Sequence, residues 1–322
     1  MRNFAHFIAR TIDEAVTLLK RYGKRGAVIA GGTDLLGKMK DEILPDYPEA
    51  LINVKSIPGL DLISYKNDML RIGALTRLED IAINDTINER YRALAEAARK
   101  TASTHLREMG TIGGNICQDV RCWYYRNQNN RFPCLRKGGG KCYAIDGDNR
   151  YHSIFGGSVE EGCYAVHPSD TAPALIALDA TMVTSRRKIK AEDFFQVEVV
   201  KTTILDDDEI ITEIQVPAPA GKSAFVKFAL RKAIDFPIVN CAAMVTLSGT
   251  KVAAARICLN AVYVKPFRAL KAEEALIGKT LTEANVENAS TAAVSDARPM
   301  PYNAYMVPVA KAMVKRAILG CA

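Results

Sequence analysis

The hydrophobic pattern of the first hundred residues predicts helices and strands in alternation. After Thr11, apolar residues recur at helical spacing, and Glu14 stands three residues further on, as in a capping box. Gly23 is placed to end this helix. Short apolar runs predict strands at 27–30, 51–54 and 70–74, and an Ala- and Leu-rich segment predicts a helix at 91–101.

The pattern changes sharply in the middle of the chain. Residues 117–163 show neither helical nor strand periodicity, and so long an irregular stretch inside a compact domain is usually functional. Regular patterning returns at 171–178 and in a predicted strand at 210–216. The Pro/Gly-rich run 217–221 then predicts a linker. Beyond it we expect strands at 224–230, 239–247 and 252–262 and helices near 266–277 and 304–318, which indicates a separate α+β C-terminal domain.

Two Gly-rich segments could hold a ligand through backbone groups. Ala30-Gly31-Gly32-Thr33-Asp34 follows a predicted strand, and its consecutive amides can form an anion-binding nest suited to a diphosphate. It lacks the GxGxxG pattern, so a Rossmann dinucleotide site is not indicated. Taken alone, this segment is better explained as an ordinary tight turn. A second predicted turn, Thr111-Ile112-Gly113-Gly114-Asn115, adds a hydroxyl, free amides and an Asn side chain, groups that suit phosphate or ribityl oxygens.

Composition sets outer limits on the kind of protein this is. The 322 residues are enough for two or three domains. With 48% hydrophobic and 25% charged residues, the chain can bury a core without disulfides or metal. No window approaches the ~20 apolar residues of a membrane span. The N-terminal segment lacks an apolar stretch of signal-peptide length, so we expect a cytoplasmic protein, or export only with a partner.

The charge excess and the cysteines fall in the same place. The net charge is +7, and six basic residues with no acid lie between Arg121 and Lys141. The same stretch contains two of the eight cysteines, and a third, Cys142, follows it directly. A basic protein invites a nucleic-acid interpretation. Because this excess is local, it points instead to a local anionic group or an acidic partner.

The irregular segment 116–166 contains five cysteines, four of which are candidate metal ligands: Cys122, Cys134, Cys142 and Cys163. Their separations of 11, 7 and 20 residues do not match the close pairs of structural zinc sites. Disulfides are disfavoured in a reducing compartment. Four thiolates from a long loop suit a [4Fe–4S] cluster, although free cysteines in a basic surface loop remain the alternative. We interpret Cys117 as a packed thiol, and Cys241, Cys258 and Cys321 as core or terminal residues.

Several motifs together resemble the FAD-binding subunit of the xanthine dehydrogenase/molybdenum hydroxylase family. They are the segments 30–35, 110–115 and 167–170, followed by 208–214, 225–232 and 265–269. The resemblance implies an α+β fold, in which a two-part FAD-binding α/β domain of the PCMH type is followed by an α+β C-terminal domain. The first domain would span 1–217, with subdomains of about 1–57 and 58–217. The second, like the CO dehydrogenase flavoprotein C-terminal domain, would span 221–322.

The resemblance also assigns roles to single residues. Those that would hold the FAD diphosphate, phosphate or ribityl oxygens are Ile29, Ala30, Gly31, Gly32, Thr33, Asp34, Thr111, Gly114 and Asn115. Asp170 would accept hydrogen bonds from FAD hydroxyls, Ile210 and Ile211 would pack on its rings, and Lys227 would lie near the flavin pyrimidine edge. Without the resemblance, Asp170 fits a helix N-cap and Lys227 a solvent-facing strand lysine.

Residues 116–166 form an insertion relative to most of that family. The sequence around its cysteines resembles the cluster loop of 4-hydroxybenzoyl-CoA reductase and of bacterial molybdenum aldehyde oxidoreductases, which implies a [4Fe–4S] cluster beside FAD. The implied partners are a large molybdenum-cofactor subunit, a small [2Fe–2S] subunit and an acidic carrier such as a ferredoxin. The implied substrate is an aldehyde, an aromatic CoA thioester or an N-heterocycle. A zinc-stabilised nucleic-acid-binding module and a stand-alone flavin oxidase are the alternatives.

Overall fold

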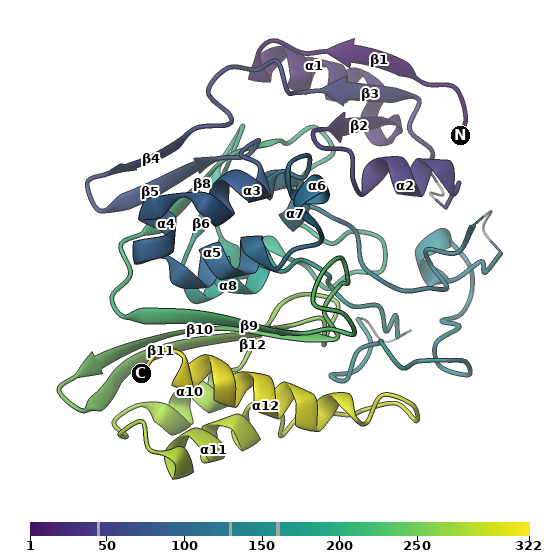
Figure 1. The fold of residues 1–322 in the computed structure, drawn as a ribbon. Coiled ribbons are helices and arrows are strands. Elements are labelled where there is room, and N and C mark those ends of the chain that lie inside the picture. Colours follow the sequence, from purple (N-terminus) through teal and green to yellow (C-terminus); the bar gives the residue numbers. More distant parts are fainter. Residues whose placement is uncertain (44–45, 129–130, 159–161) are drawn as a thin grey trace.

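The computed structural model describes residues 1–43, 46–128, 131–158 and 162–322 (Figure 1). Its N-terminal part is a small parallel sheet of strand order β1-β3-β2. The elements of this part are β1 (Ala5–Ile8), α1 (Ile12–Tyr22), β2 (Gly26–Ile29), α2 (Leu35–Lys40) and β3 (Ala50–Asn53). The predicted strands at 27–30 and 51–54 correspond to β2 and β3.

Helix α1 is capped largely as its sequence predicts. The Thr11 side chain accepts a hydrogen bond from the Glu14 amide at 3.1 Å, and the Gly23 amide, at a positive φ of 53°, donates to the Leu19 carbonyl. The Glu14 carboxylate differs from the expectation, because it accepts from the amide of Arg10 at 2.8 Å rather than from that of Thr11. The cap therefore also fixes the chain entering the helix from β1.

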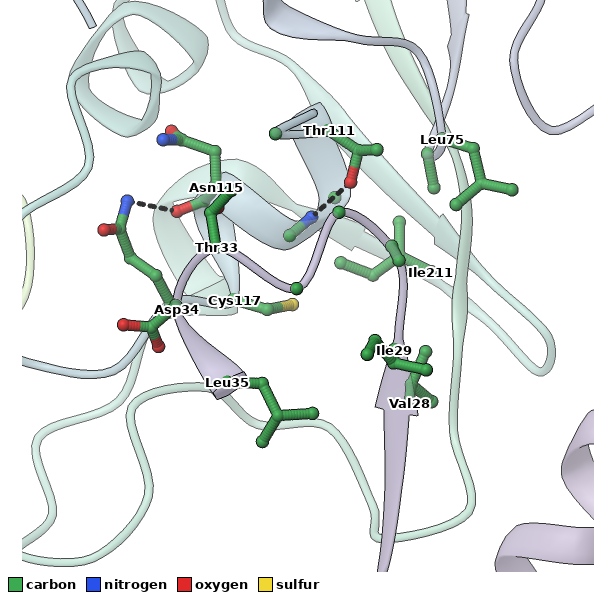
Figure 2. Close-up of a pocket in the computed structure, with 18 of the residues that line it drawn as sticks. Val28, Ile29, Thr33, Asp34, Leu35, Leu75, Thr111, Asn115, Cys117 and Ile211 are labelled. Atoms are coloured by element: carbon green, nitrogen blue, oxygen red, sulfur yellow. Dashed lines mark hydrogen bonds between the residues drawn. The ribbon is translucent and has the colours of Figure 1, made fainter. Parts of the chain in front are cut away.

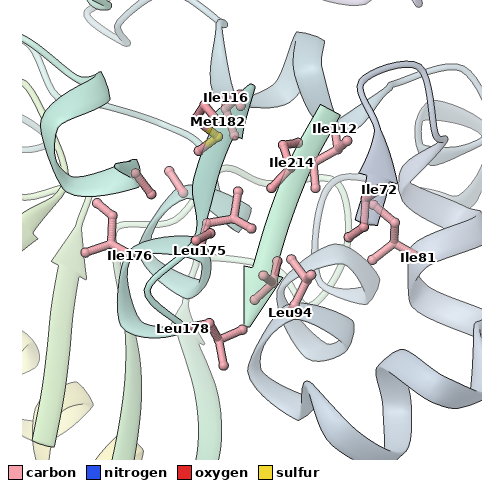
Figure 3. Close-up of a cluster of buried hydrophobic side chains, with 14 of the residues drawn as sticks. Ile72, Ile81, Leu94, Ile112, Ile116, Leu175, Ile176, Leu178, Met182 and Ile214 are labelled. Atoms are coloured by element: carbon pink, nitrogen blue, oxygen red, sulfur yellow. The ribbon is translucent and has the colours of Figure 1, made fainter. Parts of the chain in front are cut away.

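A second sheet has the strand order β4-β5-β8-β6-β7 and is antiparallel throughout. Its strands are β4 (Ile63–Lys66), β5 (Met69–Gly73), β6 (Thr181–Thr184), β7 (Lys188–Lys190) and β8 (Ile211–Pro217). The accompanying helices are α3 (Leu78–Ile83), α4 (Asp85–Arg90), α5 (Arg92–Arg99), α6 (Thr104–Arg107), α7 (Ile112–Ile116), α8 (Thr171–Ala177) and α9 (Ala191–Phe194). Figure 3 shows their apolar side chains, among them Ile72, Leu94 and Ile214, meeting in one buried cluster.

A third, antiparallel sheet of order β12-β11-β10-β9 begins four residues after β8. Its elements are β9 (Lys222–Phe228), β10 (Val239–Ser248), β11 (Lys251–Asn260) and β12 (Phe267–Arg268), followed by α10 (Leu270–Leu276), α11 (Glu283–Ala292) and α12 (Met306–Leu319). Helix α12 packs on one face of this sheet, and α5 and α8 pack on the other (Figure 1). Cys241, Cys258 and Cys321 are buried in this region, as predicted.

The insertion is almost free of regular structure where it is described, with only a 3₁₀ turn at Leu135–Lys137. Its residues 129–130 and 159–161 lie outside the described residues. Isolated bridges join Arg121 to Val166 and Cys134 to Lys141. The predicted turn at 111–115 is wrong in form, because these residues cap and begin the short helix α7. Among the helices of the described chain, none has the length and apolarity needed to cross a membrane.

We expect Phe225→Ala in β9 to destabilise the protein by about 3–5 kcal/mol, because a buried ring would leave a cavity. The ring is 1% exposed and lies in a socket of small residues from α5, α8 and β10: Ala93, Ala97, Ala174, Ala177 and Ala242. Urea and thermal unfolding would measure the loss. Phe228→Ala is the matched control, because Phe228 is 40% exposed on the same strand and its loss should change stability by less than about 0.5 kcal/mol. Equal effects would contradict the proposed packing.

Candidate functional site

A cleft of about 440 Å³ opens between the N-terminal sheet and the second sheet. Apolar side chains from both sides line it, including Ile29 at the end of β2, Leu75 after β5, and Ile210 and Ile211 at the start of β8 (Figure 2). Glycines and polar residues gather at the turn after β2 and the start of α7, with Lys38 and Glu209 as further polar lining residues. Mostly apolar walls with a few convergent polar groups are typical of cofactor sites, and the volume lies in their usual range.

The turn after β2 needs its two glycines. Gly32 has φ +74°, and a Cβ on Gly31 would lie 2.0 Å from the Met109 carbonyl oxygen, so this turn packs directly against the chain ahead of α7. Among the described residues, the amides of Gly31, Gly32 and Thr33 have no acceptor in the protein. Three donor groups at the edge of the cleft are suited to an anionic ligand.

The second polar segment contributes side chains already held by other contacts. The Thr111 hydroxyl accepts from the Gly114 amide at 3.2 Å and so caps α7, while still lining the cleft. Asn115 Oδ1 accepts from Ser169 at 2.6 Å and from Thr171 at 2.7 Å. These two hydroxyls occupy the acceptor end of the amide and leave its donor end for a ligand.

The structure brings most of the sequence-predicted FAD residues to this cleft, with two exceptions. The residues that line it are Ile29, Ala30, Gly31, Gly32, Thr33, Asp34, Thr111, Gly114, Asn115, Ile210 and Ile211. Asp170 and Lys227 do not line it. They form a buried ion pair of 2.6 Å, and Asn240 also donates to Asp170 at 2.7 Å. The alternatives of a capping side chain for Asp170 and a solvent-facing position for Lys227 are both wrong. The Asp170 side chain makes no capping hydrogen bond to α8, and the Lys227 side chain is buried.

Some lining residues were missed by sequence reasoning. Lys38, one turn after Asp34 on α2, lines the cleft, and so does Phe236 from the loop after β9. The interpretation of Cys117 as a packed thiol is wrong, because the side chain is exposed and its sulfur points into the cleft (Figure 2). The surrounding protein atoms raise the pKa of this thiol to about 12. The sequence did offer a way to find Lys38, because it stands four residues after Asp34 and so lies on the same face of a helix.

A buried ionic network joins this cleft to the insertion. Arg126 donates to Asp34 Oδ1 at 2.6 Å and to the carbonyls of Val120 and Asp119. The Asp119 amide donates to Asp34 Oδ2 at 3.1 Å. Both carboxylate oxygens of Asp34 are therefore occupied within the protein. The Asp34 side chain therefore anchors the insertion, and the FAD contact expected of this turn is left to its backbone.

Asp119 is the centre of that network. Its carboxylate accepts from the Tyr125 hydroxyl at 2.6 Å and from Lys38 at 3.2 Å, and Arg136 lies 3.6 Å away. Burial by itself would raise the pKa of Asp119, but the three cations Lys38, Arg136 and Arg126, with the Tyr125 hydroxyl, lower it well below the ordinary value. The carboxylate is therefore ionised across the physiological range.

The four predicted ligand cysteines meet at a second, small cavity inside the insertion. Cys122, Cys134, Cys142 and Cys163 are free and 6–9% exposed, and all four line this cavity together with Tyr125, Leu135 and Ala165. Within the described ranges, no group of three or more His, Cys, Asp or Glu side chains is arranged to hold a metal ion. The cysteines are thus close together without forming the tight set that a single ion requires.

Backbone amides point at the sulfurs of three of these cysteines. Tyr124 and Tyr125 donate to Cys122, Arg136 and Lys137 donate to Cys134, and Ala144 and Tyr164 donate to Cys142. After Cys122 and Cys134, the amides two and three residues on face the sulfur, whereas Cys142 has the amide two residues on and that of Tyr164, the residue after Cys163. Burial raises the pKa of Cys122 to about 12 and also raises those of Cys134 and Cys142, and the amides oppose this by favouring the thiolate.

The six basic residues of the insertion do not act as one patch. Arg136 is buried and Arg126 is half-buried, and both face the carboxylates of the ionic network. The expectation that all six offset the charge of a cluster is therefore wrong for these two. Lys137 lies near enough to Cys134 and Cys122 for the charges to interact, and Lys141 is exposed.

We expect Asp119→Asn to destabilise the protein by about 3–5 kcal/mol at pH 7, because it leaves buried cations without their carboxylate. A lowered pKa stabilises the folded state above the ordinary carboxyl value of about 3.9. The difference between wild type and variant should be constant from pH 7 to 5. It should shrink below about pH 4, where Asp119 takes up a proton in the unfolded chain while the folded protein still holds it ionised. Thermal unfolding at each pH would measure it. The control is Asp296→Asn, which removes an exposed ion pair with Lys271 and should lower the stability by under about 1 kcal/mol. An equal loss of stability in both variants would contradict the role of Asp119.

Comparison with known proteins agrees with this architecture. Family models match residues 2–219, as the FAD binding domain in molybdopterin dehydrogenase, and residues 224–320, as the CO dehydrogenase flavoprotein C-terminal domain. The chain is 35% identical to the aldehyde oxidoreductase FAD-binding subunit PaoB of Escherichia coli, over 83% of this chain and 84% of that subunit. It is 29% identical to the carbon monoxide dehydrogenase medium chain of Hydrogenophaga pseudoflava, over 98% and 96%.

Solved structures give the same result at the level of the fold. A chain of carbon monoxide dehydrogenase from Hydrogenophaga pseudoflava superposes with a TM-score of 0.78 at 28% identity, covering 99% of this chain and 97% of that one. A chain of quinoline 2-oxidoreductase from Pseudomonas putida 86, at 22% identity and TM-score 0.76, shares the fold. The expected order of an FAD-binding domain and a C-terminal domain of mixed helix and sheet is confirmed. The chain belongs to the family of FAD-binding medium subunits of the CO dehydrogenase/molybdenum hydroxylase enzymes.

Proposed function

We propose that this chain is an electron-transfer subunit in which FAD lies in the cleft and a [4Fe–4S] cluster lies among the four buried cysteines of the insertion. The observation that carries the proposal is the convergence of four free, buried cysteines on one cavity, in a chain of this flavoprotein family. When bound, FAD exchanges electrons singly or in pairs and the cluster exchanges them one at a time.

The residues of the cleft fit FAD. The unpaired amides of Gly31, Gly32 and Thr33 would hold its diphosphate, and the donor end of Asn115 would hold a phosphate or ribityl oxygen. Ile210 and Ile211 would pack against its rings and exclude water. Lys38 adds positive charge beside the turn. We assign Asp170 and Lys227 an indirect role, because their charges are satisfied by each other outside the cleft wall.

The cysteine cavity fits a cubane cluster better than a zinc ion. A cubane binds one cysteine per iron, so its four sulfurs lie further apart than the ligands of a single tetrahedral ion. This agrees with four cysteines that share a cavity but form no single-ion site among the described residues. The amide groups aimed at the sulfurs of Cys122, Cys134 and Cys142 stabilise thiolates, which a cluster requires.

The proposed partners follow from the family. The curated relatives include an FAD-binding subunit and medium chains, so we propose assembly with a large molybdenum-cofactor subunit and a small [2Fe–2S] subunit. The relatives' names favour an aldehyde or an N-heterocycle as the substrate of the assembly. The exposed residues Trp123, Lys141 and Ile145 lie within three residues of Cys122 or Cys142 in the sequence, and we propose that they meet an acidic carrier such as a ferredoxin.

The FAD assignment predicts that Gly31→Ala lowers flavin content several-fold. Its new Cβ would lie 2.0 Å from the Met109 carbonyl oxygen and push the turn away from the second polar segment. Gly37→Ala on the adjacent helix is the control, because a Cβ there meets nothing within 4 Å. Flavin absorbance per protein would measure both variants. Retention of full flavin by Gly31→Ala would contradict the role of this turn.

The cluster assignment predicts about four irons per flavin in the purified protein. Changing Cys122, Cys134, Cys142 or Cys163 singly to Ser should remove most of the iron while leaving flavin bound. Cys117→Ala is the control from the same insertion and should keep its iron, because Cys117 faces the FAD cleft. Metal analysis with flavin quantification would decide. An iron ratio well below four in the wild-type protein would contradict the cluster.

The same measurement separates the two alternatives. Zinc without flavin would favour a zinc-stabilised nucleic-acid-binding module. Flavin without iron would favour a stand-alone flavin oxidase, and so would purification without a large molybdenum subunit. Flavin and iron together in a complex with such a subunit would support the electron-transfer assignment.

A further inference from the structure

One buried polar side chain contacts the cysteine set without belonging to it. Nε2 of His152 lies 3.2 Å from Sγ of Cys122, and the residue is 1% exposed. Its other ring nitrogen, Nδ1, has no hydrogen-bond partner among the described residues. The contact with sulfur is therefore the one side-chain hydrogen bond of this ring in the part of the chain that is described, and the Asn149 backbone is a further polar neighbour.

Neighbouring aromatic rings fix the orientation of the imidazole. Trp123 and Tyr124, which directly follow Cys122, place their ring centroids 6.0 and 5.9 Å from that of His152. Both rings pack beside the imidazole in the position from which its Nε2 faces Cys122. Nε2 is thus the nitrogen presented to Cys122.

The C-terminal part of the chain holds the backbone of His152. Asn303 donates to the carbonyls of His152 at 2.9 Å and Ser153 at 3.1 Å. The amide of Tyr302 donates to Asn149 Oδ1 at 2.9 Å, and the Tyr305 hydroxyl donates to the Arg150 carbonyl at 2.9 Å. A residue held so firmly at a sulfur atom, by contacts distant in sequence, is pre-organised for that contact.

We propose that the Nε2–H of His152 donates a hydrogen bond to the Cys122 thiolate and raises the reduction potential of the [4Fe–4S] cluster. The inference rests on the cluster of the proposed function. A thiolate sulfur only accepts, so the nitrogen facing it carries the proton. Reduction adds one electron to the cluster, and an N–H···S bond stabilises that added negative charge without transferring a proton. His152 is a positioning and tuning residue, since the four cysteines already give each iron a ligand.

The test uses two variants of the flavin- and iron-loaded protein. His152→Phe keeps an aromatic ring and removes the donor, and His152→Gln keeps an N–H in about the place of Nε2. His6→Phe on β1, an exposed histidine of the N-terminal sheet, is the control. An EPR-monitored redox titration would give the cluster potential of each, and proton ENDOR after exchange into D₂O would detect the exchangeable proton near the cluster.

We expect a lower cluster potential and loss of one exchangeable proton signal in His152→Phe, with most of both restored in His152→Gln and no change in His6→Phe. An unchanged potential in an iron-loaded His152→Phe would overturn the inference. Loss of iron from both His152 variants would also overturn the inference. The glutamine variant still supplies an N–H donor, so iron loss in that variant would mean that the imidazole itself binds iron. Absence of iron from the wild-type protein would instead refute the cluster of the proposed function.

Discussion

The carboxylate of Asp119 is the contact on which the arrangement of this protein depends. The insertion has almost no ladder or helix to fix its path in the described residues, so its position rests on side-chain contacts. Asp119 supplies them by gathering Lys38 from α2 together with Tyr125 and Arg136 from the insertion. A buried carboxylate is stable only where cations and donors surround it, and this requirement makes the network specific as well as strong.

The ionic network also holds the wall of the cleft beside the insertion. Asp34 ends the Gly-rich turn at the proposed FAD cleft, and its partner Arg126 stands four residues after Cys122. One ion pair therefore holds the wall of the cleft against the segment that carries a proposed cluster ligand. Electron transfer between two centres depends on a fixed and short separation. A charge pair at their junction provides that fixity where regular secondary structure is lacking.

The C-terminal sheet completes the site from the other side. Its strand β9 packs on α5, and Asn260 at the end of β11 donates to the Ser169 carbonyl at 2.6 Å. Ser169 in turn donates to Asn115, a residue of the cleft wall. Asn303 holds the segment that carries His152. The C-terminal part thus supports the cleft and the cysteine cavity through backbone carbonyls, although Phe236 is its contribution to the wall of the cleft.

The sequence by itself determined the local elements and the inventory of candidate groups. The cap at Thr11, the strand before the first Gly-rich segment and the irregular insertion depend on neighbouring residues, which is why their patterns could be interpreted directly. Only the tertiary structure decided which groups meet. It paired Asp170 with Lys227, turned Arg126 and Arg136 inward, exposed Cys117 to the cleft and brought His152 to Cys122. These contacts join residues from 17 to 92 positions apart. No local spacing encodes them, because they arise from burying charged and polar groups against partners elsewhere in the chain.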